Sequence, residues 1–417
     1  MSNSGVDIYG YRNPSLHSFY ISLFVRAGCM YESYGQNGIT HFLEHAAIRN
    51  VNSLMGGELY SELDRRGIEF NASTYSEMIQ FYVSGAREHI AFASELICKI
   101  LSPIVLSSSE MNAERKRIKA EIRESDDKNT LTQFTNEKVF FETSLASSIV
   151  GTNSSVDKIS ARRLEEYRRS VFTSDNIFFY LTGNFDSSDV SHLMSVVDSY
   201  CLERGKFNDN IAPVPQNFGK RNGEVFVKNA DFTMIRFTFD LDMSSLGVPV
   251  VDLLYDILLS GYNSRLFIEM SERRGLFYDI SGGVERYKNI GTLNFSYEVK
   301  EREIYSSVEL VLSILSEIKQ RCLSEAECMK AGYVDNALML YDDPRELNFS
   351  FAYDNHVMGL GYASLDARRN TYAALTPEDV RNAAAEIFRF ENLTVTVKGN
   401  KRRIDVEKIK NIILEVL

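Results

Sequence analysis

Apolar positions along this chain form short continuous runs that alternate with segments of helical periodicity. The runs at 18–28 (SFYISLFVRAG), 176–186 (NIFFYLTGNFD), 225–242 and 393–400 (LTVTVKGN) each predict a strand. Residues 70–85 (FNASTYSEMIQFYVSG) alternate like strand material with a turn or break inside. The helical periodicity predicts helices at residues 39–49, 56–67, 87–102, 108–125, 187–203 and 247–260.

The order of these elements recurs beyond the middle of the chain. Residues 59–70 (LYSELDRRGIEF) and 266–278 (LFIEMSERRGLFY) share a Leu-x-x-Glu pattern followed by Arg-Arg-Gly, at an offset of 266 − 59 = 207 residues. Between them, residues 204–222 carry two of the seven prolines, which is typical of a linker. The pattern therefore predicts an α+β protein of two similar halves, 1–204 and 223–417, joined by a linker at 205–222.

Composition and charge narrow the class of protein. The chain is 44% hydrophobic and 25% charged, as in globular proteins, and no run approaches eighteen apolar residues, so we expect no membrane span. A net charge of −11 argues against nucleic acid as a partner. Five scattered cysteines without a CxxC pair, and a start unlike a signal peptide, predict a cytoplasmic protein.

Two of the six histidines stand four residues apart in THFLEHAAIRN, residues 40–50. On a helix, His41 and His45 lie on one face with Glu44 beside them. Two imidazoles at this spacing can share one Zn²⁺, and a neighbouring carboxylate can accept a proton from water. This H-x-x-E-H pattern is the inverted zincin motif. The alternative is two surface histidines beside a solvated glutamate, which the largely apolar helix disfavours.

A zinc site needs a third protein ligand, and the charged helix at 108–125 offers several carboxylates. At about 100° per residue, Met111, Ile118 and Ile122 form the apolar stripe of this helix. Glu114 falls beside the stripe and Glu121 at its border. The helical angle leaves both glutamates as candidates.

GITHFLEH, ERKRIKAEIRE and FNASTYSE resemble segments of the pitrilysin, insulin-degrading enzyme and mitochondrial processing peptidase family of inverted-motif zinc peptidases. The resemblance extends over nearly the whole chain, through YLTGNFD, SRLFIEMSERRGLFYDIS and DVRNAAAEIFRFENLTVTVKGN. Within the family, the chain resembles a short single-pair member of the bacterial type. It implies two similar halves, each an antiparallel-rich sheet covered by helices, facing each other across a cavity. Metal is expected in the first half only, because the second lacks an H-x-x-E-H motif.

The resemblance also implies a role for each site residue. The family's third ligand matches Glu121, and a further glutamate seven residues earlier matches Glu114, which would support a ligand from behind. His41, His45 and Glu121 would then hold one Zn²⁺, with Glu44 as the general base. By resemblance, the edge strand for a peptide substrate comprises Asn71, Ala72, Ser73 and Thr74.

One position departs from the family. Members that complete their own site carry, in the second half, an Arg and seven residues later a Tyr that bind substrate. The Tyr matches Tyr278, but the other position is Ser271, while Arg273 and Arg274 lie five and four residues before Tyr278. We therefore predict the catalytic subunit of a heterodimeric processing peptidase, whose related partner subunit supplies the Arg and Tyr. A homodimer is the second option, and a register slip that brings in Arg273 or Arg274 stays open.

The predicted function is that of a zinc endopeptidase acting on peptides or short unfolded segments. Two alternatives remain: a non-catalytic assembly or scaffold subunit with the same fold, and a zinc hydrolase of a non-peptide substrate. Assembly subunits in this family typically lose the metal residues, whereas this chain keeps them.

Overall fold

The computed structural model describes residues 5–33, 35–128, 130–260, 263–277, 279–321 and 324–417. The chain divides into two compact units, and neither is continuous in sequence. The first comprises Met1–Asn129, Ser147–Asn210 and Met339–Gly361, and the second comprises Thr130–Ala146, Ile211–Leu338 and Tyr362–Leu417. The predicted linker, residues 205–222, contains no helix or strand. The predicted domain boundaries themselves stay a prediction.

The first unit is built around a five-stranded sheet in the order β1-β5-β2-β4-β3. Only β1 and β5 run parallel, and the other neighbours are antiparallel. Alternate residues of β2, such as Phe19, Ile21 and Leu23, are fully buried in the core on one face of the sheet. The strands are β1 Asp7–Arg12, β2 Ser18–Val25, β3 Glu69–Thr74, β4 Ile79–Ala86 and β5 Ile177–Gly183.

Helices cover both faces of this sheet. Phe42 of α1 and Ile118 of α4 join the same apolar cluster as Ile21. On the other face, Asn348 of α12 donates to the backbone oxygen of Tyr180 at 2.8 Å, and so pins α12 to the sheet. The helices of this unit are α1 Ile39–Leu54, α2 Leu59–Arg66, α3 Ile90–Cys98, α4 Ser108–Lys128, α6 Asn153–Asp157, α7 Ala161–Val171, α8 Ser187–Asp198 and α12 Pro344–Ala352, with short helical turns at Cys29–Tyr31, Arg87–His89, Lys99–Leu101 and Tyr353–Val357.

The second unit repeats the topology of the first, with the strand order β6-β10-β7-β9-β8. Again only the outer pair, β6 and β10, is parallel. The Arg-Arg-Gly of each shared segment, ending at Gly67 and at Gly275, precedes β3 or β8, the equivalent edge strands. The predicted α+β fold of two similar halves is therefore confirmed. The strands are β6 Glu224–Asn229, β7 Met234–Asp242, β8 Ile280–Arg286, β9 Ile290–Glu298 and β10 Leu393–Gly399.

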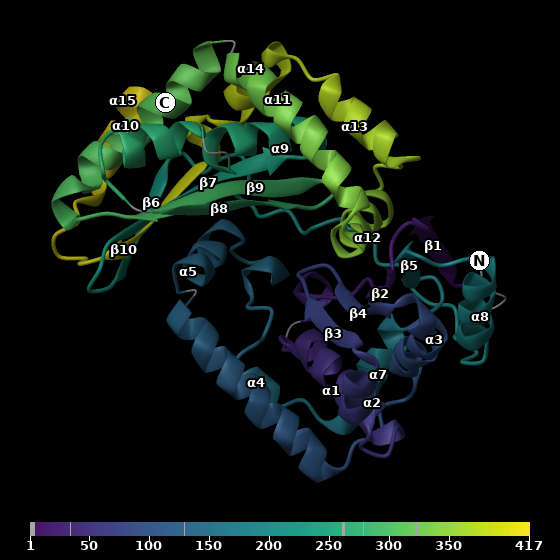
Figure 1. Ribbon diagram of the computed structural model, residues 1–417. Coiled ribbons are helices and arrows are strands. Elements are labelled where there is room, and N and C mark those ends of the chain that lie inside the picture. Colours follow the sequence, from purple (N-terminus) through teal and green to yellow (C-terminus); the bar gives the residue numbers. More distant parts are fainter. Residues whose placement is uncertain (1–4, 34, 129, 261–262, 278, 322–323) are drawn as a thin grey trace. The chain divides into compact units, whose positions relative to one another are not determined.

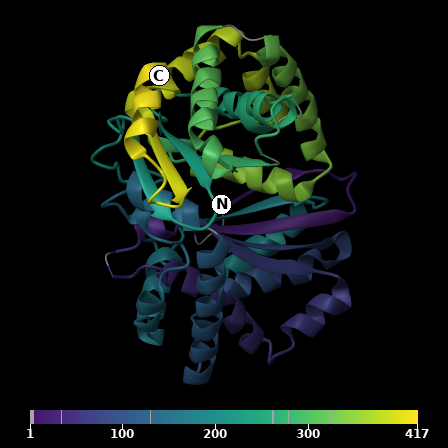
Figure 2. The ribbon, with the colours of Figure 1, turned by 90° about the vertical axis from the view of Figure 1, so that its left-hand side faces the viewer.

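In the second unit most helices lie on one face of the sheet, and α5 lies against β10 on the other face (Figures 1 and 2). Val395 and Val397 of β10 are fully buried, whereas Thr396 bonds to Thr135 of α5 at 2.6 Å between hydroxyl oxygens. The helices are α5 Thr130–Val139, α9 Val248–Tyr255, α10 Ile304–Gln320, α11 Ser324–Asn336, α13 Leu365–Ala373, α14 Pro377–Ile387 and α15 Val406–Val416, with shorter helical segments at Ser144–Ala146, Asp256–Ser260, Phe267–Glu272, Glu301–Glu303 and Phe390–Asn392. The short helical segment Ala337–Tyr341 crosses from the residues of the second unit to those of the first after Leu338.

The single strand predicted at 225–242 is wrong. The segment forms two strands, β6 and β7, which do not pair with each other because β10 lies between them. The predicted helix at 39–49 continues to Leu54. No bounds were predicted for α5, α6 and α7, nor for the helices beyond residue 260, among them α12.

Candidate metal centre

The helix α1 carries the H-x-x-E-H residues and begins at a position that requires glycine. Gly38 precedes the helix in the left-handed region, with φ 83°. A Cβ there would also lie 2.7 Å from the Cα of Gly151, too close for any side chain. Gly38 has no side chain to cap the helix, and the Glu32 carboxylate accepts hydrogen bonds from the backbone N–H groups of Gly38 at 2.9 Å and Thr40 at 3.0 Å instead.

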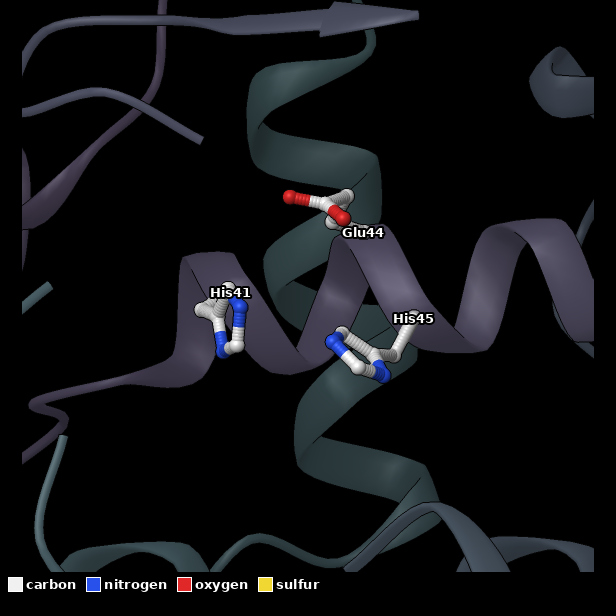
Figure 3. A group of neighbouring side chains, drawn as sticks. All are labelled: His41, Glu44 and His45. Atoms are coloured by element: carbon white, nitrogen blue, oxygen red, sulfur yellow. The ribbon is translucent and has the colours of Figure 1, made fainter. Parts of the chain in front are cut away.

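His41 and His45 project from successive turns of α1, and Glu44 stands on the same helix (Figure 3). Their potential ligand atoms lie within 4.8 Å of one another. Glu121 reaches the pair from α4: its Oε2 lies 3.5 Å from His41 Nε2 and 3.4 Å from His45 Nε2. Zinc ligands at about 2.0–2.1 Å in a tetrahedron are roughly 3.3–3.4 Å apart, so both nitrogen–oxygen separations suit a shared Zn²⁺.

The charges of the group also suit a divalent cation. Glu44, Glu114 and Glu121 supply three negative charges, and the guanidinium of Arg49, which is paired with Glu114, supplies one positive charge. Since imidazoles bind metal in the neutral form, the sum is −3 + 1 = −2. In donor type, spacing and charge, the group fits one Zn²⁺, the predicted cofactor.

The surroundings of the two imidazoles shift their pKa values in opposite directions. Burial and the neighbouring His45 lower the pKa of His41 to about 4, against the pull of Glu121. Burial also acts to lower the pKa of His45, but the carboxylates of Glu114 and Glu121 outweigh it and raise the pKa to about 9. A proton bound at His45 therefore takes the place that a metal ion would occupy.

Glu44 is buried and its carboxylate accepts a hydrogen bond from the hydroxyl of Thr74, the last residue of β3. Burial raises the pKa of Glu44, while the Thr74 hydroxyl and His45 act in the opposite direction. A carboxylate with a raised pKa is better matched to proton transfer near neutral pH than an exposed one.

Glu114 lies behind His45, away from Glu121. Its Oε2 lies 3.2 Å from His45 Nδ1, and its Oε1 accepts a hydrogen bond from Arg49 Nε. The Glu114 side chain is only 2% exposed, whereas that of Glu121 is 37% exposed. The helical angle did not distinguish the roles of the two glutamates, but they occupy different places. Glu114 lies behind His45, and Glu121 lies between His41 and His45. Arg49 was not singled out from the sequence.

The remaining predicted site residues lie on β3 and in the second unit. Asn71, Ala72, Ser73 and Thr74 pair with β4 on one side, and no described strand pairs with β3 on the other. Ser271 donates its hydroxyl to the backbone oxygen of Phe277 at 2.8 Å. Arg273 and Arg274 both pair with the Glu269 carboxylate. Tyr278 lies outside the described residues.

The fold and the site define a two-unit α+β protein with an inverted zinc-peptidase motif in one unit. Residues 10–153 match the family described as insulinase (peptidase family M16), and residues 158–331 match the peptidase M16 inactive domain. The chain belongs to the M16 peptidase family, the predicted family, and at the family level it is a metallopeptidase.

Similar proteins span nearly the same length. An uncharacterized zinc protease of Streptomyces coelicolor is 23% identical over 90% of this chain and 83% of its own. A protease structure from Helicobacter pylori superposes with a TM-score of 0.82 at 16% identity, covering 96% of this chain and 98% of its own. A chain of complex III2 from Candida albicans gives a TM-score of 0.80 at 14% identity, covering 99% and 98%. The shared fold therefore does not by itself distinguish peptidases from other proteins.

Within the described residues, no helix combines the length and apolar character needed to cross a membrane.

Proposed function

We propose that this protein is a zinc-dependent endopeptidase that cleaves peptides or short unfolded segments. The observation that carries the proposal is the convergence of His41 Nε2, His45 Nε2 and Glu121 Oε2, at 3.4–3.5 Å, beside the buried carboxylate of Glu44. His41, His45 and Glu121 would hold the metal, and Glu114 would support His45. When bound, Zn²⁺ polarises a carbonyl group and lowers the pKa of water towards about 7.

Glu44 performs the proton transfers of the proposed reaction. Its carboxylate takes a proton from the attacking water as the new carbon–oxygen bond forms. It then gives that proton to the leaving amine as the carbon–nitrogen bond breaks. The Thr74 hydroxyl orients the carboxylate through its hydrogen bond. Because Glu44 both accepts and returns the proton, no further acid is required.

The substrate is proposed to bind as an added strand along β3. The edge of β3 with which no described strand pairs, at residues 71–74, offers backbone N–H and C=O groups to an extended peptide. Thr74, at the end of this edge, contacts Glu44, so a peptide paired with β3 runs towards the proposed base. This mode of binding contacts the backbone of the substrate more than its side chains. It requires an extended chain, which favours peptides and unfolded segments over folded proteins.

We further propose that the chain works as the zinc-bearing subunit of a heterodimer. Ser271 stands where a self-sufficient member carries arginine, and its hydroxyl is used locally by Phe277. Arg273 and Arg274 are both held by Glu269, so their charges are already paired. A related subunit would supply an Arg and Tyr pair, and a homodimer is the second option. Cys29, Cys98 and Cys201 form no disulfide within the described part of the chain, which suits the cytoplasm, where we place the enzyme.

The proposal is tested by cleavage of an unstructured peptide mixture, with and without a chelator, by the wild type and by Glu44→Gln. We expect chelation to abolish cleavage, and Glu44→Gln to lower the rate by about 10²–10⁴-fold while zinc stays bound. A wild-type rate in Glu44→Gln contradicts the role of Glu44. A zinc-loaded chain that cleaves no peptide, even with a related subunit present, supports an assembly subunit or a zinc hydrolase of another substrate.

The heterodimer has its own test. The isolated, zinc-saturated chain is expected to be weakly active or inactive because it lacks the substrate-binding arginine. Full activity of the isolated chain, unchanged in Arg273→Ala and in Arg274→Ala, contradicts the requirement for a partner. Full activity that either substitution abolishes identifies that arginine as the substitute.

A further inference from the structure

We propose that Arg49 is a positioning residue of the metal centre, which holds the Glu114 carboxylate in the orientation that fixes the imidazole ring of His45. The inference rests on the proposed role of His45 as a metal ligand. It assigns a function to a residue that follows the H-x-x-E-H motif by one helical turn and that makes no contact with the metal itself.

Three side chains form a continuous hydrogen-bonded series. Arg49 Nε donates to Glu114 Oε1, and Glu114 Oε2 lies 3.2 Å from His45 Nδ1. The opposite nitrogen of the ring, His45 Nε2, lies 3.4 Å from Glu121 Oε2. One carboxylate oxygen of Glu114 thus contacts His45, which could bind the metal, and the other contacts Arg49, which lies further from the metal site.

The series determines which nitrogen of His45 carries the proton. A carboxylate beside Nδ1 accepts the Nδ1–H, and this leaves the lone pair on Nε2, the nitrogen that faces Glu121 and His41. If the carboxylate turned away, the neutral ring could carry its proton on Nε2, and Nε2 would then have no lone pair for a metal. The orientation of Glu114 is therefore part of the metal site.

Glu114 depends on Arg49 for this orientation. Its side chain is 2% exposed, while that of Arg49 is 32% exposed, so the guanidinium lies between a buried carboxylate and solvent. A buried carboxylate that loses its charged partner is strongly destabilised. Without Arg49, Glu114 would turn towards solvent or towards the metal, and either movement releases His45.

His41 has no comparable support. Its Nδ1 is buried and has no hydrogen-bond partner among the described residues. Apart from packing, the ring of His41 therefore contacts only groups of the site itself, such as Glu121 on its Nε2 side, whereas His45 is also oriented by Glu114 from behind. This asymmetry makes the centre sensitive to Arg49, although Arg49 lies outside it.

The test is the zinc affinity of the full chain, measured by competition with a chromophoric chelator, so that it does not depend on activity. Arg49→Met keeps much of the side-chain length and removes the donors and the charge. We expect it to bind zinc about 10–100-fold more weakly than the wild type. Arg162→Met is the matched control, because Arg162 pairs with Glu166 on the exposed face of α7, and wild-type affinity is expected. Wild-type affinity in Arg49→Met overturns the inference, as does an equal loss in Arg162→Met.

Arg49→Lys separates position from charge and serves if Arg49→Met does not fold. Lysine restores the positive charge but not the planar fork that places Nε against Oε1. We expect a smaller but measurable loss of zinc affinity, and wild-type affinity would overturn the inference. His45→Phe distinguishes this failure from a failure of the proposed function. If His45→Phe binds zinc as the wild type does, His45 is not a ligand and the proposed metal site is wrong. If it weakens binding and both Arg49 variants do not, only the role of Arg49 is wrong.

Discussion

Thr74 links β3, the strand along which the substrate is proposed to bind, to the proposed base, because its hydroxyl donates to Glu44 Oε2. Hydrogen bonds to charged groups are worth about 1.5–3 kcal/mol, which corresponds to roughly 10–100-fold in rate. We therefore expect Thr74→Val to lower kcat by about 10–100-fold with little change in zinc affinity. Thr74→Ser, which keeps the hydroxyl, should retain most of the rate. Equal rates in the valine variant and the wild type would show that Glu44 needs no such orientation.

His356 gives a pH-dependent contribution to stability away from the metal centre. Its ring stacks on Tyr9 at 3.7 Å between centroids. Burial and the nearby Arg26 lower the pKa of His356 from 6.5 to about 4, while Asp7 acts in the opposite direction. Between pH 6.5 and about 4, His356 is therefore protonated in the unfolded chain but not in the folded chain. The stability of the folded state falls as the pH is lowered through this window.

This prediction is checked by thermal unfolding of the wild type and His356→Phe at pH 7.5 and pH 5. Phenylalanine keeps the stacked ring and cannot take up a proton. The decrease in Tm between the two pH values should therefore be smaller in His356→Phe than in the wild type. An equal decrease in both proteins would show that other groups carry the pH dependence.

The sequence identified the residues that are close in sequence or carried by the family motif, and it missed their contacts. His41, Glu44 and His45 lie on one helix, so spacing alone brings them together. Arg49 and Thr74 contribute through contacts with Glu114 and Glu44, which are distant in sequence. No periodicity within one element reports such a contact, because it depends on how α1, α4 and β3 pack.

At the scale of elements, α1 depends on a cap supplied from outside the helix. Glu32 accepts from the backbone of Gly38 and Thr40, and His41 follows in the first turn. Loss of a helix cap costs about 0.5–2 kcal/mol. We expect Glu32→Ala to lower the free energy of unfolding by about this amount, in urea titrations, and to weaken zinc binding because the turn that carries His41 frays.

Asp186→Ala is the matched control for this prediction. Asp186 caps α8 by accepting from the backbone of Ser188 at 2.8 Å and Asp189 at 3.2 Å. Its loss should lower stability to a similar extent without changing zinc affinity. If the two substitutions affect zinc binding equally, the cap of α1 has no particular bearing on the metal centre.

Elements with a strong pattern of their own were predicted, and elements that depend on distant partners were not. The continuous apolar runs in β2 and β5 follow from burial of both faces of these central strands. By contrast, α12 is fixed through Asn348, whose partners Ser22 and Tyr180 are more than 160 residues away. The division of residues 225–242 into β6 and β7 likewise results from the insertion of β10, at the other end of the unit's sequence.

At the scale of the whole molecule, a shared pattern in two segments was enough to indicate two similar halves, because the Arg-Arg-Gly of each segment precedes the equivalent edge strand of its sheet. The exchange of residues 130–146 and 339–361 between the units was not predicted. Its cause is tertiary: Thr135, for example, bonds to Thr396 of the second unit's sheet. The halves are thus similar in topology without being separate stretches of sequence.

The central claim is that the chain holds one Zn²⁺ through His41, His45 and Glu121, with Glu44 beside the metal but not bound to it. The most direct test is the zinc affinity of the wild type, Glu44→Gln, Glu114→Gln and Glu121→Gln under one set of conditions. We predict wild-type affinity in Glu44→Gln, a modest loss in Glu114→Gln, whose amide oxygen can still accept from His45, and the largest loss in Glu121→Gln. Loss of zinc in Glu44→Gln, or equal losses in Glu114→Gln and Glu121→Gln, would contradict it.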